Sequence, residues 1–180
     1  KVLVDGVNVR SYEQEDLRNR IGYVSQKAIL FSGTVSANVA YGEAGRGEVT
    51  EADVREAVSI AQAAEFVERM DGAYGAAIAQ SGTNVSGGQK QRLSIARAVA
   101  RKPEILIFDD SFSALDYRTD KALRQALRER TADTTKIIVA QRISTIRDAD
   151  QILVLDHGKI VGKGTHEELL KNCPEYLEIA

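Results

Sequence analysis

Two consecutive carboxylates, Asp109 and Asp110, directly follow the apolar run Ile105-Leu-Ile-Phe108. A short, wholly apolar run predicts a strand buried on both faces of a parallel sheet, and open α/β sheets bind ligands at the carboxyl ends of such strands. One carboxylate there can hold the Mg²⁺ of a nucleotide, while its neighbour polarises an attacking water. The pattern alone is weak, because an apolar strand followed by Asp also fits a turn or a helix cap.

A second candidate, Val85-Ser-Gly-Gly-Gln89, stands at the start of a predicted helix that runs to about Arg101 and is stopped by Pro103. Two adjacent glycines at a helix start allow another molecule to approach the backbone closely. The free amides and the positive end of the helix also favour a phosphate. Helix capping alone is the simpler alternative interpretation.

This second segment resembles the signature motif of the nucleotide-binding domain of ABC transporters, Leu-Ser-Gly-Gly-Gln, with Val85 in the first place. Other segments resemble further motifs of that family and follow in its order. They are Ile21 to Gln26 for the Q-loop, Gln80 to Gly82 for the exporter X-loop, Ile105 to Asp109 for the Walker B strand, Ser113 to Asp116 for the D-loop and Asp156 to Thr165 for the closing hairpin. Leu30 to Thr34 and Asn38-Val39 resemble the exporter subtype, so the resemblance covers essentially the whole chain.

The resemblance implies an α/β fold, with an ABC-type P-loop NTPase core of mostly parallel sheet flanked by helices. Residues 1–180 are expected to be one such domain, with a helical subdomain at about 35–100. The element pattern agrees with this fold class, since strands and helices alternate in the second half and Asp5-Gly6 predicts an antiparallel hairpin near the start. Lys136 to Ala140 and Gln151 to Leu155 indicate further buried strands.

Capping boxes are predicted at two helix starts. Ser11 with Gln14 predicts one for a short helix through Leu17, and Thr165 with Glu168 predicts one for the closing helix. Both pairs place a hydroxyl three residues before a Gln or Glu, which is the spacing of that motif.

The phosphate-binding P-loop of the family, G-x-x-x-x-G-K-[ST], is missing from the sequence and would be expected shortly before residue 1. The chain is therefore expected to be truncated at its N-terminus, as a fragment or part of a longer chain. The near match from Gly158 to Thr165 is rejected, because its spacing is wrong and Gly164 stands where Ser or Thr is needed.

The resemblance also implies cofactors and residue roles. ATP and Mg²⁺ would be the cofactors, with Asp109 and Gln26 as metal ligands and Asp110 and Gln141 at the two catalytic positions. The residues expected to contact the nucleotide are Gln26, Ser86, Gly87, Gly88, Gln89 and Asp116.

Two catalytic positions depart from the family pattern. Asp110 stands where the family has Glu, and its shorter side chain would hold the carboxylate about an ångström or more from the water, which can cost on the order of 10²-fold in rate. Gln141 stands where the family has His, and an amide cannot carry a positive charge. Because the signature motif is intact, the chain resembles the degenerate partner in a heterodimeric exporter. A homodimer with two slow sites is the alternative.

Composition excludes some partners and compartments. The 24 Lys and Arg are balanced by 26 Asp and Glu and mixed along the chain, so nucleic acid is not expected as a partner. The single cysteine, Cys173, fits a reduced compartment. The longest apolar runs fall far short of the roughly 20 residues that span a bilayer.

Three functions follow from these observations. The first is the ATPase domain of an ABC exporter at the cytoplasmic face of the cell membrane, working with a transmembrane domain and a second nucleotide-binding domain. The second is a non-enzymatic fragment that keeps the signature surface but binds no nucleotide. The third, a soluble ABC ATPase, is disfavoured by the exporter-like segment from Phe31 to Val39.

Overall fold

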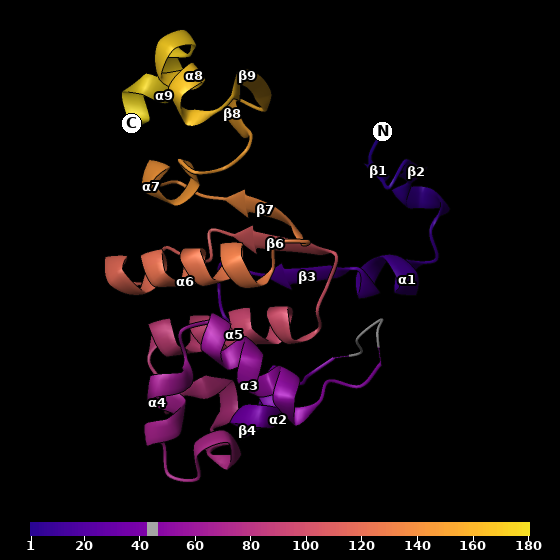
Figure 1. The fold of residues 1–180 in the computed structure, drawn as a ribbon, viewed down its shortest axis with the longest axis vertical. Helices are drawn as coiled ribbons and strands as arrows, with labels where there is room; N and C mark the ends of the chain where they lie inside the picture. The colour runs from indigo at the N-terminus through magenta and orange to yellow at the C-terminus, as the bar shows by residue number, and fades with distance from the viewer. Residues whose placement is uncertain (43–46) are drawn as a thin grey trace. The chain divides into compact units, whose positions relative to one another are not determined.

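The computed structural model describes residues 1–42 and 47–180. It divides into two compact units, Lys1–Ile137 and Ile138–Ala180 (Figure 1). The helical subdomain expected at about 35–100 includes residues 43–46, which lie outside the described residues. Parallel strands with helices make up the first unit, so the predicted α/β class is confirmed.

The chain begins with the predicted hairpin, β1 (Leu3–Val4) and β2 (Val7–Asn8), which pair antiparallel. Asp5 and Gly6 form its turn with φ of 49° and 79°, as a two-residue turn of this kind requires. The capping box predicted at Ser11 is wrong. Ser11 lies in a short 3-10 helix, η1 (Val9–Ser11), whereas a cap residue needs an extended backbone, and α1 (Gln14–Asn19) starts after Glu13 without a side-chain cap.

One sheet has the order β3-β6-β7, with β3 (Ile21–Val24), β6 (Ile105–Asp109) and β7 (Thr135–Val139), and the boundary between the two units falls within β7. Strands β3 and β6 run parallel, and Val24 lies opposite Phe108. Because the carboxyl ends of parallel strands meet at one edge, the loop after β3 lies beside the two carboxylates at the end of β6, Asp109 and Asp110.

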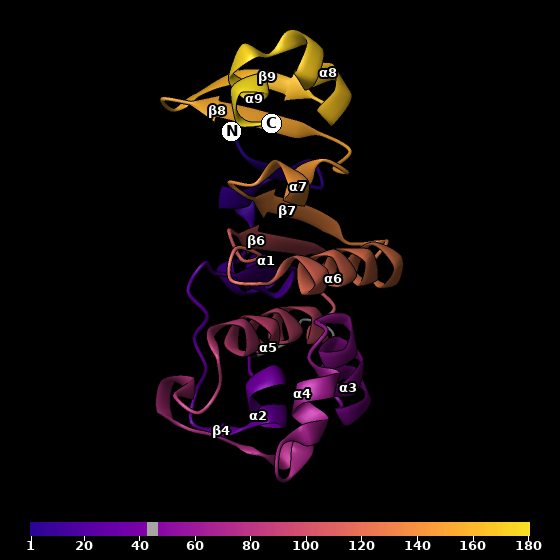
Figure 2. The ribbon, with the colours of Figure 1, turned by 90° about the vertical axis from the view of Figure 1, so that its left-hand side faces the viewer.

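Helix α5 (Gly87–Ala100) is the central helix of the first unit. It packs against β3, α2 (Val35–Val39) and α3 (Glu51–Ile60), and its Leu93, Ile95 and Ala96 are fully buried. Both ribbon views show α5 between the sheet and the group of α2, α3 and α4 (Figures 1 and 2). The remaining elements of this group are α4 (Ala64–Arg69), the 3-10 helices η2 (Ala73–Gly75) and η3 (Gln80–Gly82), and the antiparallel pair β4 (Gly33–Thr34) and β5 (Ala77–Ile78).

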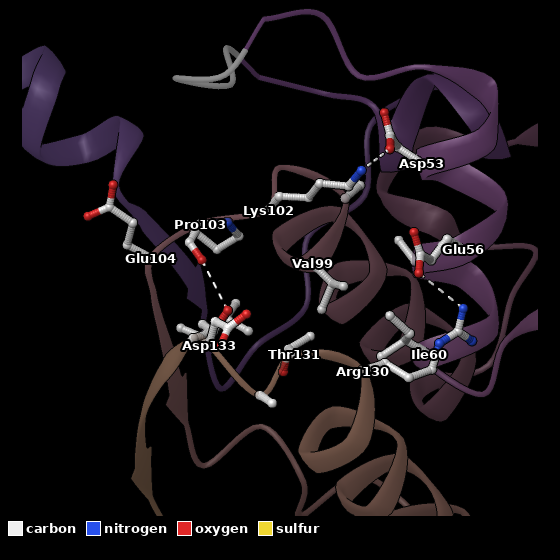
Figure 3. A pocket seen from close by; sticks show the side chains of 15 residues that line it. Asp53, Glu56, Ile60, Val99, Lys102, Pro103, Glu104, Arg130, Thr131 and Asp133 are labelled. Carbon is white, nitrogen blue, oxygen red and sulfur yellow. Dashed lines mark hydrogen bonds and ion pairs between the residues drawn. The ribbon is translucent and has the colours of Figure 1, made fainter.

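Helix α6 (Tyr117–Arg130) connects β6 to β7 and contacts α3. A hollow of about 320 Å³ lies between α3, the end of α5 and the end of α6 (Figure 3). Ion pairs Lys102–Asp53 and Arg130–Glu56 lie at this hollow, the second with an N–O distance of 3.1 Å. These pairs tie α3 to the segments that lead into β6 and β7.

The second unit has its own core. It contains α7 (Ile143–Ile146), the antiparallel hairpin β8 (Ile152–Asp156) and β9 (Lys159–Gly164), α8 (His166–Asn172) and α9 (Pro174–Ile179). Its buried cluster is Ile152, Val154, Leu169, Cys173 and Tyr176. Gly162 is needed by this packing, since a Cβ there would stand 2.6 Å from the sulfur of Cys173. The P-loop-like stretch is therefore a packed strand.

Burial on both faces of the apolar strands was predicted, and the structure corrects it. In β6, Leu106 and Phe108 are fully buried, while the alternate residues are only partly buried. In β7, Ile137 and Val139 are 50% and 53% exposed, and β8 also alternates. An apolar run shows which side chains tolerate burial, but not how many layers cover the sheet.

Candidate functional site

Residues at the carboxyl ends of β3 and β6 meet at one edge of the sheet. The Tyr23 hydroxyl donates to Oδ2 of Asp109 at 2.9 Å, and Nε2 of Gln26 donates to Oδ2 of Asp110 at 3.1 Å. The hydrogen bond to Asp109 raises the pKa of the Tyr23 phenol. The structure thus brings together three predicted site residues, Gln26, Asp109 and Asp110.

Asp110 has an unusual backbone. Its φ of 44° is in the left-handed region, which Asp adopts more readily than most residues. The Ser113 hydroxyl donates to the Asp110 carbonyl at 2.8 Å, and the fully buried Ser111 hydroxyl donates to the Val24 carbonyl at 2.8 Å. These bonds hold the turn that carries Asp110 against the end of β3.

The signature segment is a capped helix start. The Ser86 hydroxyl accepts from the Gln89 amide at 3.2 Å, and Oε1 of Gln89 accepts from the Ser86 amide at 2.8 Å, which completes a capping box for α5. A Cβ placed on Gly87 would meet no described atom within 4 Å. At Gly88 it would lie 3.4 Å from the carbonyl oxygen of Ala114, so the signature adjoins the D-loop segment.

Asp116 caps helix α6. Its Oδ1 accepts from the Thr119 amide at 3.0 Å, and hydrogen bonding by Thr119 lowers the pKa of this carboxyl. The local contacts of Asp116 are therefore those of a helix cap.

Two side chains of α5 that the sequence reasoning did not single out anchor the loop after β3. The buried Gln91 donates through Nε2 to the Ser25 carbonyl at 3.2 Å. Arg97 donates to the carbonyls of Ile29 and Asn38 at 2.9 and 2.7 Å, and burial lowers its pKa. Polar residues spaced along an apolar helix face are the signal that could have found them.

Gln141 lies in the second unit, between β7 and α7, and is exposed. The structure therefore places it in a different unit from Asp109 and Asp110.

The donors at the sheet edge fit Mg²⁺. Mg²⁺ is commonly held by one or two protein oxygens together with waters and substrate phosphates. Asp109 supplies a carboxylate. Because Nε2 of Gln26 donates to Asp110, the amide oxygen of Gln26 is the atom that could bind a metal. Within the described ranges, no group of three or more His, Cys, Asp or Glu could hold a metal by itself.

The hollow between α3, α5 and α6 and the lengths of the helices bear on the sequence predictions as well. The hollow in Figure 3 is not lined by any of the predicted site residues. Among residues 1–42 and 47–180, no helix has the length and apolar character needed to cross a membrane.

Comparison with known proteins identifies the family. The chain is 52% identical over 179 residues to an uncharacterised ABC transporter ATP-binding protein of Mycobacterium tuberculosis and 40% identical over 179 residues to an ATP-dependent lipid A-core flippase of Haemophilus influenzae. Each match covers 99% of this chain and 30% of the relative, so the chain spans under a third of their length.

The structure of a bacterial Atm1-family ABC exporter with ATP bound matches with a TM-score of 0.91 and 38% identity, over 98% of this chain and 31% of that one. Residues 1–113 match the family model described as ABC transporter. The motif order, the shared sheet edge and these matches lead to one conclusion: the chain belongs to the ABC transporter family.

Proposed function

We propose that this chain is the ATP-binding and ATP-hydrolysing domain of an ABC exporter. It works at the cytoplasmic face of the membrane and drives export through ATP-dependent dimerisation. The observation that carries the proposal is the bond from Gln26 to Asp110 beside Asp109, because it joins the Q-loop and Walker B positions at one sheet edge. The named relatives support it, since an ATP-dependent flippase is 40% identical to this chain and an ATP-bound exporter at 38% identity shares its fold.

Within the site, Asp109 and the amide oxygen of Gln26 would hold Mg²⁺, which would supply charge neutralisation for the phosphates. Asp110 orients and polarises the attacking water. Its bond from Gln26 fixes the carboxylate, but a carboxylate on one methylene fewer than Glu reaches less far. Hydrolysis at this site is slow because Asp110 and Gln141 both depart from the family pattern.

The signature serves the site of a second nucleotide-binding domain. Glycine at the first helical position costs helix stability relative to alanine, and Gly87 has no described neighbour that requires it. A close approach by a phosphate from outside the chain explains the residue. An intact signature beside a weakened site supports a heterodimer, in which the partner's site carries most of the turnover.

A transmembrane domain docks on the segment after the Q-loop. Three apolar side chains there are exposed, namely Ile29 at 57%, Phe31 at 41% and Tyr41 at 55%. The ring centroids of Phe31 and Tyr41 lie 4.4 Å apart. Arg97 stacks on both rings and donates to the Ile29 carbonyl, which links this apolar surface to α5. Such a surface suits a partner of low polarity.

Photolabelling of the full-length protein with an azido-ATP tests the nucleotide site. We expect Mg²⁺-dependent labelling of residues 1–180 that Asp109→Asn lowers at least about tenfold, since the metal ligand set is broken. Asp133→Asn, which neutralises a carboxylate at the hollow in Figure 3, is the matched control and should label normally. Equal labelling of both variants would contradict the site.

Residues 1–180 alone should bind Mg-ATP weakly, because the sequence holds no P-loop to cradle the phosphates. Calorimetric titration checks this. A micromolar Kd would show a phosphate cradle elsewhere in the chain. Failure of the full-length protein to label at all would favour the rival function, a non-enzymatic ABC domain.

A further inference from the structure

Tyr23 and Asp109 lie on neighbouring strands in a defined register. Tyr23 lies opposite Ile107 in the parallel pair, and Asp109 is two residues further along β6. Side chains two residues apart in a strand project on the same face, so the phenol points along the face that carries the carboxylate. The result is the 2.9 Å bond from the hydroxyl to Oδ2.

This bond leaves one carboxylate oxygen available. An ionised carboxylate only accepts hydrogen bonds, and each of its oxygens can accept about two. Among the described residues, Tyr23 is the one side chain that donates to the carboxylate of Asp109. The phenol therefore fixes the rotation of the group, and no donor from residues 1–42 or 47–180 contacts Oδ1.

Metal-ligating carboxylates are commonly oriented by such hydrogen bonds from outside the ligand shell. We propose that Tyr23 is a positioning residue for Asp109, which its phenol holds so that Oδ1 faces a nucleotide-bound divalent cation. The inference rests on the proposed function, because it requires Asp109 to be a metal ligand. Gln26 gives Asp110 a comparable bond from the same strand end, so the two carboxylates are oriented by separate donors.

A merely structural role for the phenol makes a different prediction. Tyr23 is 56% exposed, and an exposed hydrogen bond adds little to folding stability. Tyr23→Phe keeps the ring and removes only the donor, so it should fold like the unsubstituted protein. Any loss then has to arise at the carboxylate.

The test measures Mn²⁺ binding by electron paramagnetic resonance in the full-length protein saturated with a non-hydrolysable ATP analogue. The signal that Asp109→Asn removes belongs to this site. We expect Tyr23→Phe to weaken Mn²⁺ binding at that site roughly 10-fold or more, with metal-free nucleotide affinity unchanged. Tyr12→Phe is the matched control, since the Tyr12 hydroxyl donates to the Val4 carbonyl at 3.1 Å, and should leave Mn²⁺ binding unchanged.

Two results would overturn the inference, and they are distinguishable. Unchanged Mn²⁺ binding in Tyr23→Phe, with the Asp109→Asn signal lost, refutes the role of Tyr23 and leaves the proposed function standing. A Mn²⁺ signal that survives Asp109→Asn refutes the metal role of Asp109, and both proposals fail together.

Discussion

The start of α5 and the edge formed by β3 and β6 are assembled in opposite ways. At the helix start, Ser86 and Gln89 exchange two hydrogen bonds between side chain and backbone, and they are only three residues apart in sequence. At the sheet edge, Gln26 reaches Asp110 across 84 residues, and Ser111 reaches Val24 across 87. The first region is complete within one turn of helix, while the second exists only when the two strands pair.

This difference predicts that substitutions in the two regions will have different kinds of effect. A self-contained helix start keeps its shape under most changes, so substitutions there should act on what approaches from outside. The sheet edge depends on distant contacts, so substitutions there should act on folding and chemistry together. Four predictions test this contrast.

Gly88→Asp should have the largest effect. A side chain there meets the Ala114 carbonyl at 3.4 Å and places a negative charge where a phosphate would approach. If the proposed function holds, steady-state ATPase of the full-length protein should fall on the order of 10²- to 10³-fold. Gly75→Asp, at a glycine whose Cβ position is open, is the control. A larger fall for Asp110→Asn than for Gly88→Asp would reverse the assignment of the slow and fast sites.

The double change Asp110→Glu with Gln141→His should raise hydrolysis at this chain's own site. Glu brings the carboxylate to the water and His supplies a donor that can share charge, which together give roughly a 10²-fold gain. The gain stays short of a complete site, because Glu adopts the φ of 44° less readily, at a cost of about 1 kcal/mol.

Single-turnover hydrolysis under saturating Mg-ATP measures this gain, with the general base of the other site disabled. Each single change should do less than the pair. No rise in the double variant would show that other residues make the site slow.

Ser111→Ala tests the long-range bonds directly. It removes a fully buried donor from the Val24 carbonyl, so the free energy of unfolding should fall by about 1 to 3 kcal/mol. Ser113→Ala removes an exposed bond of the same 2.8 Å length, formed across three residues, and should cost less. Urea unfolding, followed by far-ultraviolet circular dichroism, compares the two variants. Equal losses of unfolding free energy would show that the long-range bond is no more important to stability than the local one.

The contrast between local and long-range contacts also explains which features could be predicted from the sequence. The hairpin turn at Asp5-Gly6, the start of α5 at Ser86 and the box of Thr165 with Glu168 are all local, and the structure confirms them. The bond from Tyr23 to Asp109 depends on a parallel register that no short pattern encodes. Gln26, Asp109 and Asp110 were predicted from family motifs, and their proximity follows from that pairing.

The wrong predictions have physical causes as well. Ser11 has the spacing of a cap, but the Asn8 side chain accepts from the Arg10 amide and starts a 3-10 helix there first. The apolar runs of β7 and β8 match buried strands in composition, yet Ile137 and Leu153 are each 50% exposed. Composition limits what can be buried, while the layers that cover a strand come from elsewhere in the fold.

Asp116→Asn should have the smallest effect, because Asn caps a helix as well as Asp does. The pKa of Asp116 is lowered in the folded chain, chiefly by the hydrogen bond with Thr119. A lowered folded pKa means that the charge stabilises the fold above the unfolded value, about 3.9, and that this contribution is lost as pH falls through the folded pKa. Stability at pH 7 should therefore stay unchanged in the Asn variant, while the loss of stability in acid should become shallower.

Urea unfolding at a series of pH values from neutral to acid checks this expectation, with Asp116→Ala as the variant that loses both cap and charge. An Asn variant as acid-sensitive as the unsubstituted chain would show that the Asp116 charge does not stabilise the fold. The comparison also bears on the D-loop. Because Asn preserves the cap, ATPase of the full-length Asn variant should match that of the unsubstituted protein if Asp116 acts only through α6. A tenfold or greater fall with stability intact would place the Asp116 charge in the nucleotide chemistry, where the family resemblance puts it.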